Sequence, residues 1–598
     1  AGSSVAGSRS RSVGHRDGSP NAKGVGRVLA KGRRGGILAL CLIAALVLVA
    51  CGRGGGPTPA QGETGQAQEP TEEAAPRKGG TLTVGTFSDI ITINPLFIDD
   101  VPSQEVANLV LASLYDVDPQ GNVIVDETSL AAELPEISED ELTYTVKLKE
   151  GPKWTDGQPV TAEDVAWTIE MYRNPDVGSP AIANFDKVEK VEVVDPQTVR
   201  VTLKQVYAPF LYTLAGLQPL PKHVFEGVAP GDLQKHPYGT DPSETVTNGP
   251  WKWTEWTQKQ YVTLERNADY WGPEPYIDKV VFKIYADQNT LAQAMLNGEI
   301  DVLPGVDVKT LPALQGKEGI QILESPGPVY DYLGFNFNPD NFPDGFVPWA
   351  SQKTRQAIAY AINRQGMVDS ILQGHGQLLN GPFLPGSWAD AGTAVNYPYD
   401  PEKAKQLLAE DGWTPGPDGI LQKDGHRFEF TLQTNAGNER REQVAAVIQQ
   451  NLKDVGIQVN IETLDFSSWV DNHIIPGKYQ AILIGWRLTL DPDAESIFSS
   501  KYFPPNGQNS GWYKNEEIDR LWVEGYSTTD QEERKQVYAE IARLISEDLP
   551  YVFLYTQNVI AAYSDRVQWQ EADKPVLTLP DGWQYNMEKW WLADAGGQ

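Results

Sequence analysis

The sequence predicts a mixed α/β protein, and three observations support this. Strict alternation of apolar and polar residues predicts strands, as in Leu142–Lys149, where every second side chain faces the same way. Apolar stripes at helical spacing follow capping residues, as in the helix expected to open with a capping box at Thr161-Ala-Glu-Asp164. No fixed-period repeat and no linker interrupts the chain beyond Gly79, so its domains are expected to be interwoven.

Further elements are predicted from residues that favour turns and helix ends. Asp195-Pro196 is expected to turn a hairpin between Val188–Val194 and Thr198–Leu203. A helix is predicted over Asp400–Gly412, where the Asp caps it, Pro401 follows at the first position and the Gly lies just past its end. Three elements are predicted near the C-terminus: a helix with an apolar stripe from Val444 to Val455, the strand Ile457–Ile461, and a helix opening at Thr529.

Residues 1–50 have the organisation of an export signal. Eight basic side chains and a single acidic one precede Ile37–Ala50, a run of 14 apolar residues. The run is shorter than the roughly 20 residues of a membrane-spanning helix. Leu48, Ala50 and Cys51 resemble the lipobox of bacterial lipoproteins, which implies cleavage before Cys51 and its acylation. We expect an exported protein, lipid-anchored to the outer face of the cytoplasmic membrane or on the periplasmic side; the alternative is a signal anchor with an incidental cysteine.

Residues 51–78 are predicted to form a disordered tether. Gly, Pro, Glu and Gln dominate the segment, which has no apolar periodicity and cannot bury enough surface to offset its chain entropy. The body that follows is long enough for two or three domains. The net charge of the whole chain is −31 although its signal is basic. Such an acidic body repels nucleic acid, which we exclude as a partner.

The sequence carries few signs of catalytic chemistry. It has no H-E-x-x-H motif, no G-x-S-x-G elbow, no P-loop and no paired C-x-x-C, and its six histidines never lie at metal-ligand spacing. Removal of the signal would leave Cys51 as the only cysteine, without a disulfide framework. We therefore expect no enzyme, no metal site and no cofactor. Abundant carboxylates leave a secreted hydrolase as the alternative of another class.

Several blocks, in a fixed order along nearly the whole body, resemble one family. The largest is Leu142–Pro175, which combines a strand, an aromatic residue, an Asp-Gly turn and a capped helix. The others are Ile93–Leu96, Thr247–Trp251, Arg266–Trp271, Met295–Val302, Arg355–Arg364, Tyr399–Ala404, Gly485-Trp486 and Asp548–Pro550. On these residues the sequence is identified as a member of the extracellular solute-binding proteins of family 5, the peptide-type receptors of ABC importers.

The resemblance implies a two-lobed, periplasmic-binding-protein-like α/β fold of the large type II class, with an extra third subdomain. The expected bounds are 79–122, 248–337 and 558–598 for lobe I, 123–247 for the extra subdomain, and 338–557 for lobe II. The hinge is expected at two crossovers, Asn336–Asn338 and Gln557–Ala561. Ligand that bridges the lobes would stabilise the closed form, because only that form makes both sets of contacts.

The resemblance also implies a ligand site. In peptide-binding relatives the strand of the Gly-Trp motif pairs with the ligand's backbone, and an Asp three residues after the Trp holds its α-ammonium group. That position is Thr489 here, so either Asp491 or Asp493 would take the role, unless both are solvated around a turn. Arg487 would bind a ligand carboxylate or form a surface pair. The expected ligand-binding residues are Gly485, Trp486, Arg487, Thr489, Asp491, Asp493, Asn94 and Trp388.

The expected ligand is an oligopeptide, captured by lobe closure and delivered to the importer. An oligosaccharide receptor of the same family is the alternative, because aromatic side chains such as Trp388 can stack on sugars, although most tryptophans only pack. The expected partners are ABC permease subunits with cytoplasmic ATPases, besides the membrane reached through the lipid anchor. The protein is expected to be a monomer.

Overall fold

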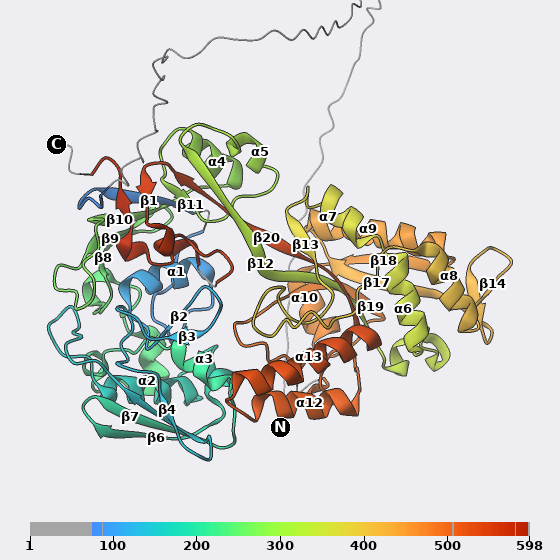
Figure 1. Cartoon of the computed structure of the whole chain (residues 1–598), viewed down its shortest axis with the longest axis horizontal. Coiled ribbons are helices and arrows are strands. Elements are labelled where there is room, and N and C mark those ends of the chain that lie inside the picture. Colours follow the sequence, from blue (N-terminus) through green and yellow to red (C-terminus); the bar gives the residue numbers. More distant parts are fainter. Residues whose placement is uncertain (1–74, 87, 505–506, 580–581, 596–598) are drawn as a thin grey trace, which may run out of the picture. The chain divides into compact units, whose positions relative to one another are not determined.

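Two long antiparallel strands, β12 and β20, form the middle of the largest sheet (Figure 1). The computed structural model describes residues 75–86, 88–504, 507–579 and 582–595, all within one compact unit. Within them this sheet has 11 strands. Its order is β18 (Gln458–Leu464), β17 (Glu429–Asn435), β19 (Ala481–Arg487), β12 (Ile320–Phe335), β20 (Tyr551–Ser564), β11 (Val302–Leu303), β1 (Thr81–Thr86), β10 (Lys279–Ile284), β9 (Tyr261–Arg266) and β8 (Trp251–Thr257), with β13 (Gly376–Leu378) paired to β20 off this path.

A second sheet of four strands contains the hairpin predicted around Asp195-Pro196. Its order is β4 (Glu136–Ile137), β5 (Thr143–Lys147), β7 (Thr198–Leu203) and β6 (Val188–Asp195). Both the hairpin and the alternating strand at β5 are confirmed. Short pairs complete the strands: β2 (Asp116–Val117) with β3 (Val123–Ile124), β14 (Thr414–Pro415) with β15 (Leu421–Lys423) and β16 (His426–Arg427), and β21 (Val567–Gln568) with β22 (Trp591–Leu592).

The helices are α1 (Val101–Val110), α2 (Ala162–Arg173), α3 (Phe210–Ala215), α4 (Gln288–Leu296), α5 (Leu311–Leu314), α6 (Gln352–Ala361), α7 (Arg364–Ser370), α8 (Pro401–Glu410), α9 (Glu439–Asp454), α10 (Phe466–Trp469), α11 (Glu495–Phe498), α12 (Glu516–Tyr526) and α13 (Gln531–Asp548). Seven of the described helices, α1, α4, α7, α8, α9, α12 and α13, begin after an Asp or Asn whose side chain accepts a backbone N–H of the first turn. The capping box of α2 and the Asp400 cap of α8 are confirmed. The cap of α13 is Asp530, one residue after the predicted start, because its carboxylate accepts the first free backbone N–H groups.

Apolar side chains pack into two groups of cores. The division between the two groups crosses the large sheet within β12 and β20. One side takes side chains from Leu82 to Leu314 and from Ile560 to Ala595. The other takes side chains between Tyr330 and Tyr555. The first group of cores includes the second sheet and the C-terminal segment, and the second group surrounds β17, β18 and β19. The mixed α/β class predicted from the sequence is confirmed.

The strands β12 and β20 take part in both groups of cores. In β12, Leu323 packs against the first group, whereas Leu333 and Phe335 lie in the second. The two strands lose their regular register between Pro326 and Tyr330. The chain therefore passes from one group of cores to the other within β12. The lobe bounds 248–337 and 338–557 stay a prediction.

At that crossing the two backbones come very close. A Cβ at Gly327 would collide with the carbonyl oxygen of Gln557, so only glycine fits. The crossing of β20 lies between Tyr555, in the second group of cores, and Ile560, in the first. Two continuous strands, rather than flexible linkers, thus join the two groups of cores.

The N-terminal expectations lie mainly outside the described residues. The signal, Cys51 and most of the predicted tether are among them. Arg77 donates to the carbonyl oxygen of Ala593 at 3.0 Å and Lys78 forms an ion pair with Glu274, so these last tether residues belong to the body instead. Among the helices of the described part of the chain, none has the length and apolar character needed to span a membrane.

Candidate functional site

The Gly-Trp-Arg segment predicted to meet ligand forms the last three residues of β19. One edge of β19 pairs with β12 along its whole length, ending at Val329 opposite Arg487. The other edge pairs with β17 only at Ala481 and Ile482. From Ile484 to Arg487 this edge faces no paired strand of the described chain. An extended ligand could add there as a further strand.

A buried ionic cluster lies against β19 at Gly485. Asp331, 0% exposed, forms ion pairs with Arg440 and, at 3.2 Å, with Arg441. The phenol of Tyr555 donates to the same carboxylate at 3.0 Å. A Cβ on Gly485 would stand 2.7 Å from Oδ1 of Asp331, so a larger residue there would displace the cluster. Gly485, in the strand that carries the predicted ligand contacts, therefore packs directly against this cluster.

A first cavity, of about 420 Å³, opens at the end of β19. Its walls come from both sides of the core division, with Val329 and Arg487 facing Glu105 and Trp583. The guanidinium of Arg487 makes no hydrogen bond or ion pair with any described residue, and the side chain is exposed. Arg487 is thus free to bind an anionic group, in a cavity of the size that small ligands occupy.

A second cavity, of about 470 Å³, adjoins the first. Both share Leu579 and Gly582 in their walls. The second is lined by the later turns of α1, by α3, and by the C-terminal segment that ends at Glu588. Leu490, from the loop after β19, closes one side. The two cavities together extend from the open strand edge into the first group of cores.

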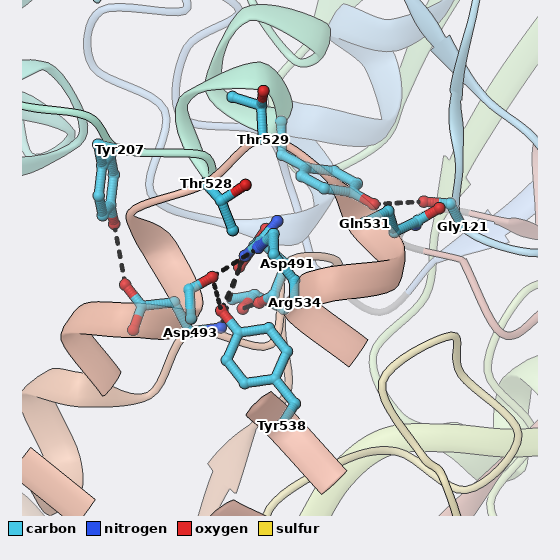
Figure 2. A network of polar contacts seen from close by, with 12 residues as sticks. Gly121, Tyr207, Asp491, Asp493, Thr528, Thr529, Gln531, Arg534 and Tyr538 are labelled. Atoms are coloured by element: carbon cyan, nitrogen blue, oxygen red, sulfur yellow. Dashed lines mark hydrogen bonds and ion pairs between the residues drawn. The ribbon is translucent and has the colours of Figure 1, made fainter. Parts of the chain in front are cut away.

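Asp491 does not face either cavity. It is buried, 6% exposed, and binds the guanidinium of Arg534 through two contacts of 2.8 Å (Figure 2). Arg534 also donates to the carbonyl oxygen of Gly525 at 2.7 Å and to the hydroxyl of Tyr538 at 2.8 Å. Asp491 is therefore already neutralised by a cation of its own chain, which argues against a role in holding a ligand's ammonium group.

Asp493 stands in a different environment from Asp491. Its Oδ2 accepts from the phenol of Tyr207 at 3.2 Å, and its Oδ1 caps Glu495 at 3.0 Å (Figure 2). It has no cationic partner in the described chain. Burial, and then the nearby charges of Asp491 and Glu495, raise the pKa of Asp493 to about 6. Of the two candidate carboxylates, Asp493 is the one that lacks a counter-charge.

The remaining predicted residues are placed away from the cavities. The hydroxyl of Thr489 donates to the carbonyl oxygen of Asp491 at 2.5 Å, and the ring of Trp388 lies under Arg534, 5.2 Å from its centre. Asn94 is 1% exposed and packs against the backbone of Gly239. None of the three lines either cavity, and their predicted contacts with ligand stay predictions.

The residues of the second cavity were missed from the sequence. Asp116 and Glu588 both line it, although they lie near opposite ends of the chain. Neither belongs to a motif, and no spacing between them is informative. Only the fold brings them together, through β2 and the C-terminal segment. The nearest signal in the sequence was the acidic composition itself, which does not single out any carboxylate.

Two groups of cores joined by continuous strands, with an open strand edge and cavities where they meet, define a ligand-binding protein of the two-lobed type. The chain belongs to the bacterial extracellular solute-binding proteins, family 5, whose middle-region model matches residues 127–509. The predicted family and the predicted fold class, a two-lobed α/β fold with an extra subdomain, are confirmed. This family comprises solute-binding proteins of the cell exterior.

Individual relatives span nearly the whole body. The oligopeptide-binding protein AppA of Bacillus subtilis is 34% identical over 533 residues, which cover 87% of this chain and 92% of AppA. The solved structure of AppA in complex with a nonapeptide matches with a TM-score of 0.67 and 32% identity, over 87% of this chain and 100% of that one. NikZ of Campylobacter jejuni, solved in complex with Ni(L-His), matches with a TM-score of 0.68 and 27% identity, over 86% and 99%.

Proposed function

We propose that this chain is the substrate-binding receptor of an ABC importer and that it captures oligopeptides by lobe closure. AppA, 34% identical, is named for oligopeptide binding and holds a nonapeptide in its solved structure. The observation that carries the proposal is the open edge of β19 from Ile484 to Arg487, beside the two cavities. Pairing through the backbone gives affinity without demanding particular side chains, which suits a receptor for varied peptides.

Lobe movement is proposed to occur at the crossings of β12 and β20. The irregular pairing between Pro326 and Tyr330 leaves fewer hydrogen bonds to resist bending there. The domain bounds expected from the resemblance are kept as a proposal, with the bound in β12 moved to Gly327–Val329. Two strands that cross side by side restrict the motion to a bend about one axis, as in hinged binding proteins.

Contacts between the extra subdomain and the second group of cores would form on closure. The backbone N–H of Ala208 donates to the carbonyl oxygen of Tyr526 at 2.9 Å. Glu141 accepts from the backbone N–H of Thr529 at 2.8 Å. Together with the bond between Tyr207 and Asp493, these contacts favour a closed form, which a bridging ligand would populate further.

Arg487 and Asp493 are proposed to hold the two ends of the ligand. Arg487 is unpaired and faces the first cavity, so it would bind a peptide's carboxylate. Asp493 keeps the proposed role at the α-ammonium group because it alone of the two carboxylates lacks a cation, although it would meet ligand only after Tyr207 moves. Asp491 is left out of this role because Arg534 holds it.

The ligand is identified directly by native mass spectrometry of the purified protein. We expect intact oligopeptides to be carried through purification and released on unfolding, and synthetic nonapeptides to rebind in calorimetry. A co-purified oligosaccharide or a metal–amino-acid chelate, with no peptide binding, would replace the peptide proposal. Breakdown of any incubated peptide or oligosaccharide would instead favour the hydrolase, since a receptor releases its ligand unchanged.

The location of the protein is proposed from the sequence alone. Cleavage before Cys51 and acylation of that residue would anchor the protein to the outer face of the membrane. Metabolic labelling with an alkyne fatty acid tests this, with Cys41→Ala as the matched control. Label is expected in the control and is expected to disappear in Cys51→Ala. Persistent label in Cys51→Ala, or a mature chain that retains residues 1–50, would contradict the proposal.

The partners are proposed to be a pair of permease subunits and their cytoplasmic ATPases, with the receptor itself monomeric. Peptide-loaded receptor should stimulate the ATPase activity of the importer reconstituted in vesicles, while empty receptor should stimulate it less. Light scattering should give the mass of one chain. A dimer would contradict the monomer, and equal stimulation by both forms would contradict closure as the delivered signal.

A further inference from the structure

The second cavity has a partly aromatic wall. Its volume of about 470 Å³ lies within the range of pockets that hold small ligands. Trp251 and Tyr270 line one side and Met587 another. Leu490, four residues after Trp486, forms part of the rim. An extended peptide on the edge of β19 would therefore pass its opening, and one of its side chains could enter.

Two buried side chains in this wall have polar atoms without a hydrogen-bond partner among the described residues. Glu588 and Gln584 are each 8% exposed. Oε1 of Glu588 and both polar atoms of the Gln584 amide make no hydrogen bond to another described residue. The hydroxyl groups of Tyr115 and Tyr270, in the same wall, are also without one. Buried polar groups without hydrogen bonds are costly and rare. Their concentration in this wall therefore indicates a binding site for a polar ligand.

The wall is also negatively charged. Asp116 lines it with Glu588, and the negative charge of Asp126 acts on both. Lys589, whose charge acts on both carboxyl groups, also forms an ion pair of 3.8 Å with Asp573. Burial first, and the neighbouring carboxylates next, raise the pKa of Glu588 to about 7 and that of Asp116 to about 6. The charge of Lys589 lowers both pKa values but does not outweigh burial.

The geometry suits an organic cation better than a metal ion. In the described part of the chain, no three His, Cys, Asp or Glu side chains are grouped so that they could hold a metal. An ammonium or guanidinium group needs less: one or two carboxylates and a few neutral acceptors at hydrogen-bond distance. Gln584 and the tyrosine hydroxyls supply the acceptors, and the ring of Trp251 would pack on an aliphatic stem.

We propose that this cavity is a specificity pocket for a lysine or arginine side chain of the bound peptide, held by Glu588 and Asp116. The proposal rests on the peptide-receptor function proposed above and adds a preference to it. Backbone pairing at β19 accepts many sequences, and the cavity selects those with a positive side chain at one position. The preference arises because a neutral side chain leaves the buried acceptors unpaired, whereas a cation satisfies them.

The test uses alanine nonapeptides that carry one lysine, moved through each position in turn. Each is matched by the same peptide with norleucine, which keeps the stem and lacks the charge. Calorimetry is expected to find one position at which the wild type prefers lysine at least tenfold. Glu588→Gln and Asp116→Asn are expected to reduce the preference to less than threefold. Glu571→Gln removes an exposed carboxylate of the same C-terminal segment and is expected to leave it unchanged.

Binding of the norleucine peptides shows that each variant is folded and closes normally. If no position prefers lysine, or the preference survives both Glu588→Gln and Asp116→Asn, the pocket proposal is overturned while the peptide receptor stands. If N-acetylation removes the preference, the α-ammonium group rather than a side chain occupies the cavity, which also overturns it.

Agmatine, a small guanidinium compound, separates the two proposals. Suppose that no nonapeptide binds, but agmatine shifts the thermal unfolding of the wild type and of Glu571→Gln and not that of Glu588→Gln. Peptide capture then fails and the cation pocket stands as a site for a small cation. If agmatine has no effect on the wild type either, both proposals fail.

Discussion

The phenol of Tyr207 donates a hydrogen bond of 3.2 Å to the carboxylate of Asp493, across the division between the two groups of cores (Figure 2). Tyr207 packs with the first group, whereas Ala494, the neighbour of Asp493, packs with the second. The bond therefore exists only while the extra subdomain lies against the loop that follows β19. It is a direct measure of closure.

Loss of this hydrogen bond is expected to favour the open form. Tyr207→Phe keeps the ring packing and removes only the hydroxyl, whose net contribution is about 0.5–1.5 kcal/mol. Ligand affinity should fall roughly two- to tenfold by the same figure, with an unchanged unfolding midpoint. Small-angle scattering should show an expanded ligand-free protein. Tyr238→Phe, which removes a bond to the carbonyl of Val246 within the subdomain, is the control and should leave both measurements unchanged.

The stability of the protein should depend on the charge of Asp493. Its pKa is raised from 3.8 to about 6 by burial, with Asp491 and Glu495 adding to the effect while Tyr207 opposes it. The folded protein thus keeps a proton that the unfolded chain releases between these pH values. Stability is lost as the pH rises from about 4 to 6, by roughly 3 kcal/mol at neutral pH. Asp493→Asn, which can keep both hydrogen bonds, should be more stable than the wild type at pH 7.5 and equal to it at pH 4 in urea unfolding. A difference that does not change with pH would contradict this.

The buried pair of Arg534 and Asp491 should be costly to break from one side only. Arg534→Met leaves the buried carboxylate of Asp491 without a counter-charge. It is expected to lower the free energy of unfolding by about 3–5 kcal/mol. The double variant with Asp491→Asn should recover at least half of the loss, which a double-mutant cycle in denaturant measures. Arg520→Met, at an exposed pair with Glu517, is the control and should change stability by no more than about 0.5 kcal/mol. Additive losses in the double variant would argue against the pair.

Affinity for a lysine-bearing peptide should rise with pH. A cation in the second cavity stabilises the ionised forms of Glu588 and Asp116, whose pKa values are about 7 and 6 in the empty cavity. Binding then releases protons, and affinity rises by up to about tenfold per pH unit for each proton released. The rise should end above pH 7, because both groups are then ionised before binding. Tyr270 stays neutral over this range, because burial raises its pKa well above the usual value. Calorimetry in buffers of different ionisation enthalpy counts the protons. A norleucine peptide with the same pH dependence would contradict the assignment.

Local elements of the fold could be predicted because their signals are local. The capping box from Thr161 to Asp164, the Asp400 cap and the hairpin at Asp195-Pro196 each depend on side chains that contact backbone a few residues away. The pairing of β12 with β20 had no such local signal in the sequence. Its partners are far apart in sequence, so no local pattern indicated that the two strands would pair.

The site was predictable only where it lies on one segment. Gly485, Trp486 and Arg487 lie at the end of a strand, as the resemblance implied, and Arg487 lines the first cavity. Their contacts with ligand stay a prediction. Asp491 and Asp493 could not be distinguished by spacing, because Arg534, which decides between them, is contributed by another helix. The cavity of Glu588 depends wholly on contacts between the two ends of the body.

The order in which the chain is synthesised determines when β12 and β20 can pair. Synthesis finishes β12 at Phe335, long before β20 begins at Tyr551, and the pairing of β11 also depends on β20. The first half of the chain therefore cannot complete its sheet until the last segment emerges, and contacts this distant in sequence form slowly. Such a delay would favour export of the chain before it folds, which the signal proposed at residues 1–50 would require.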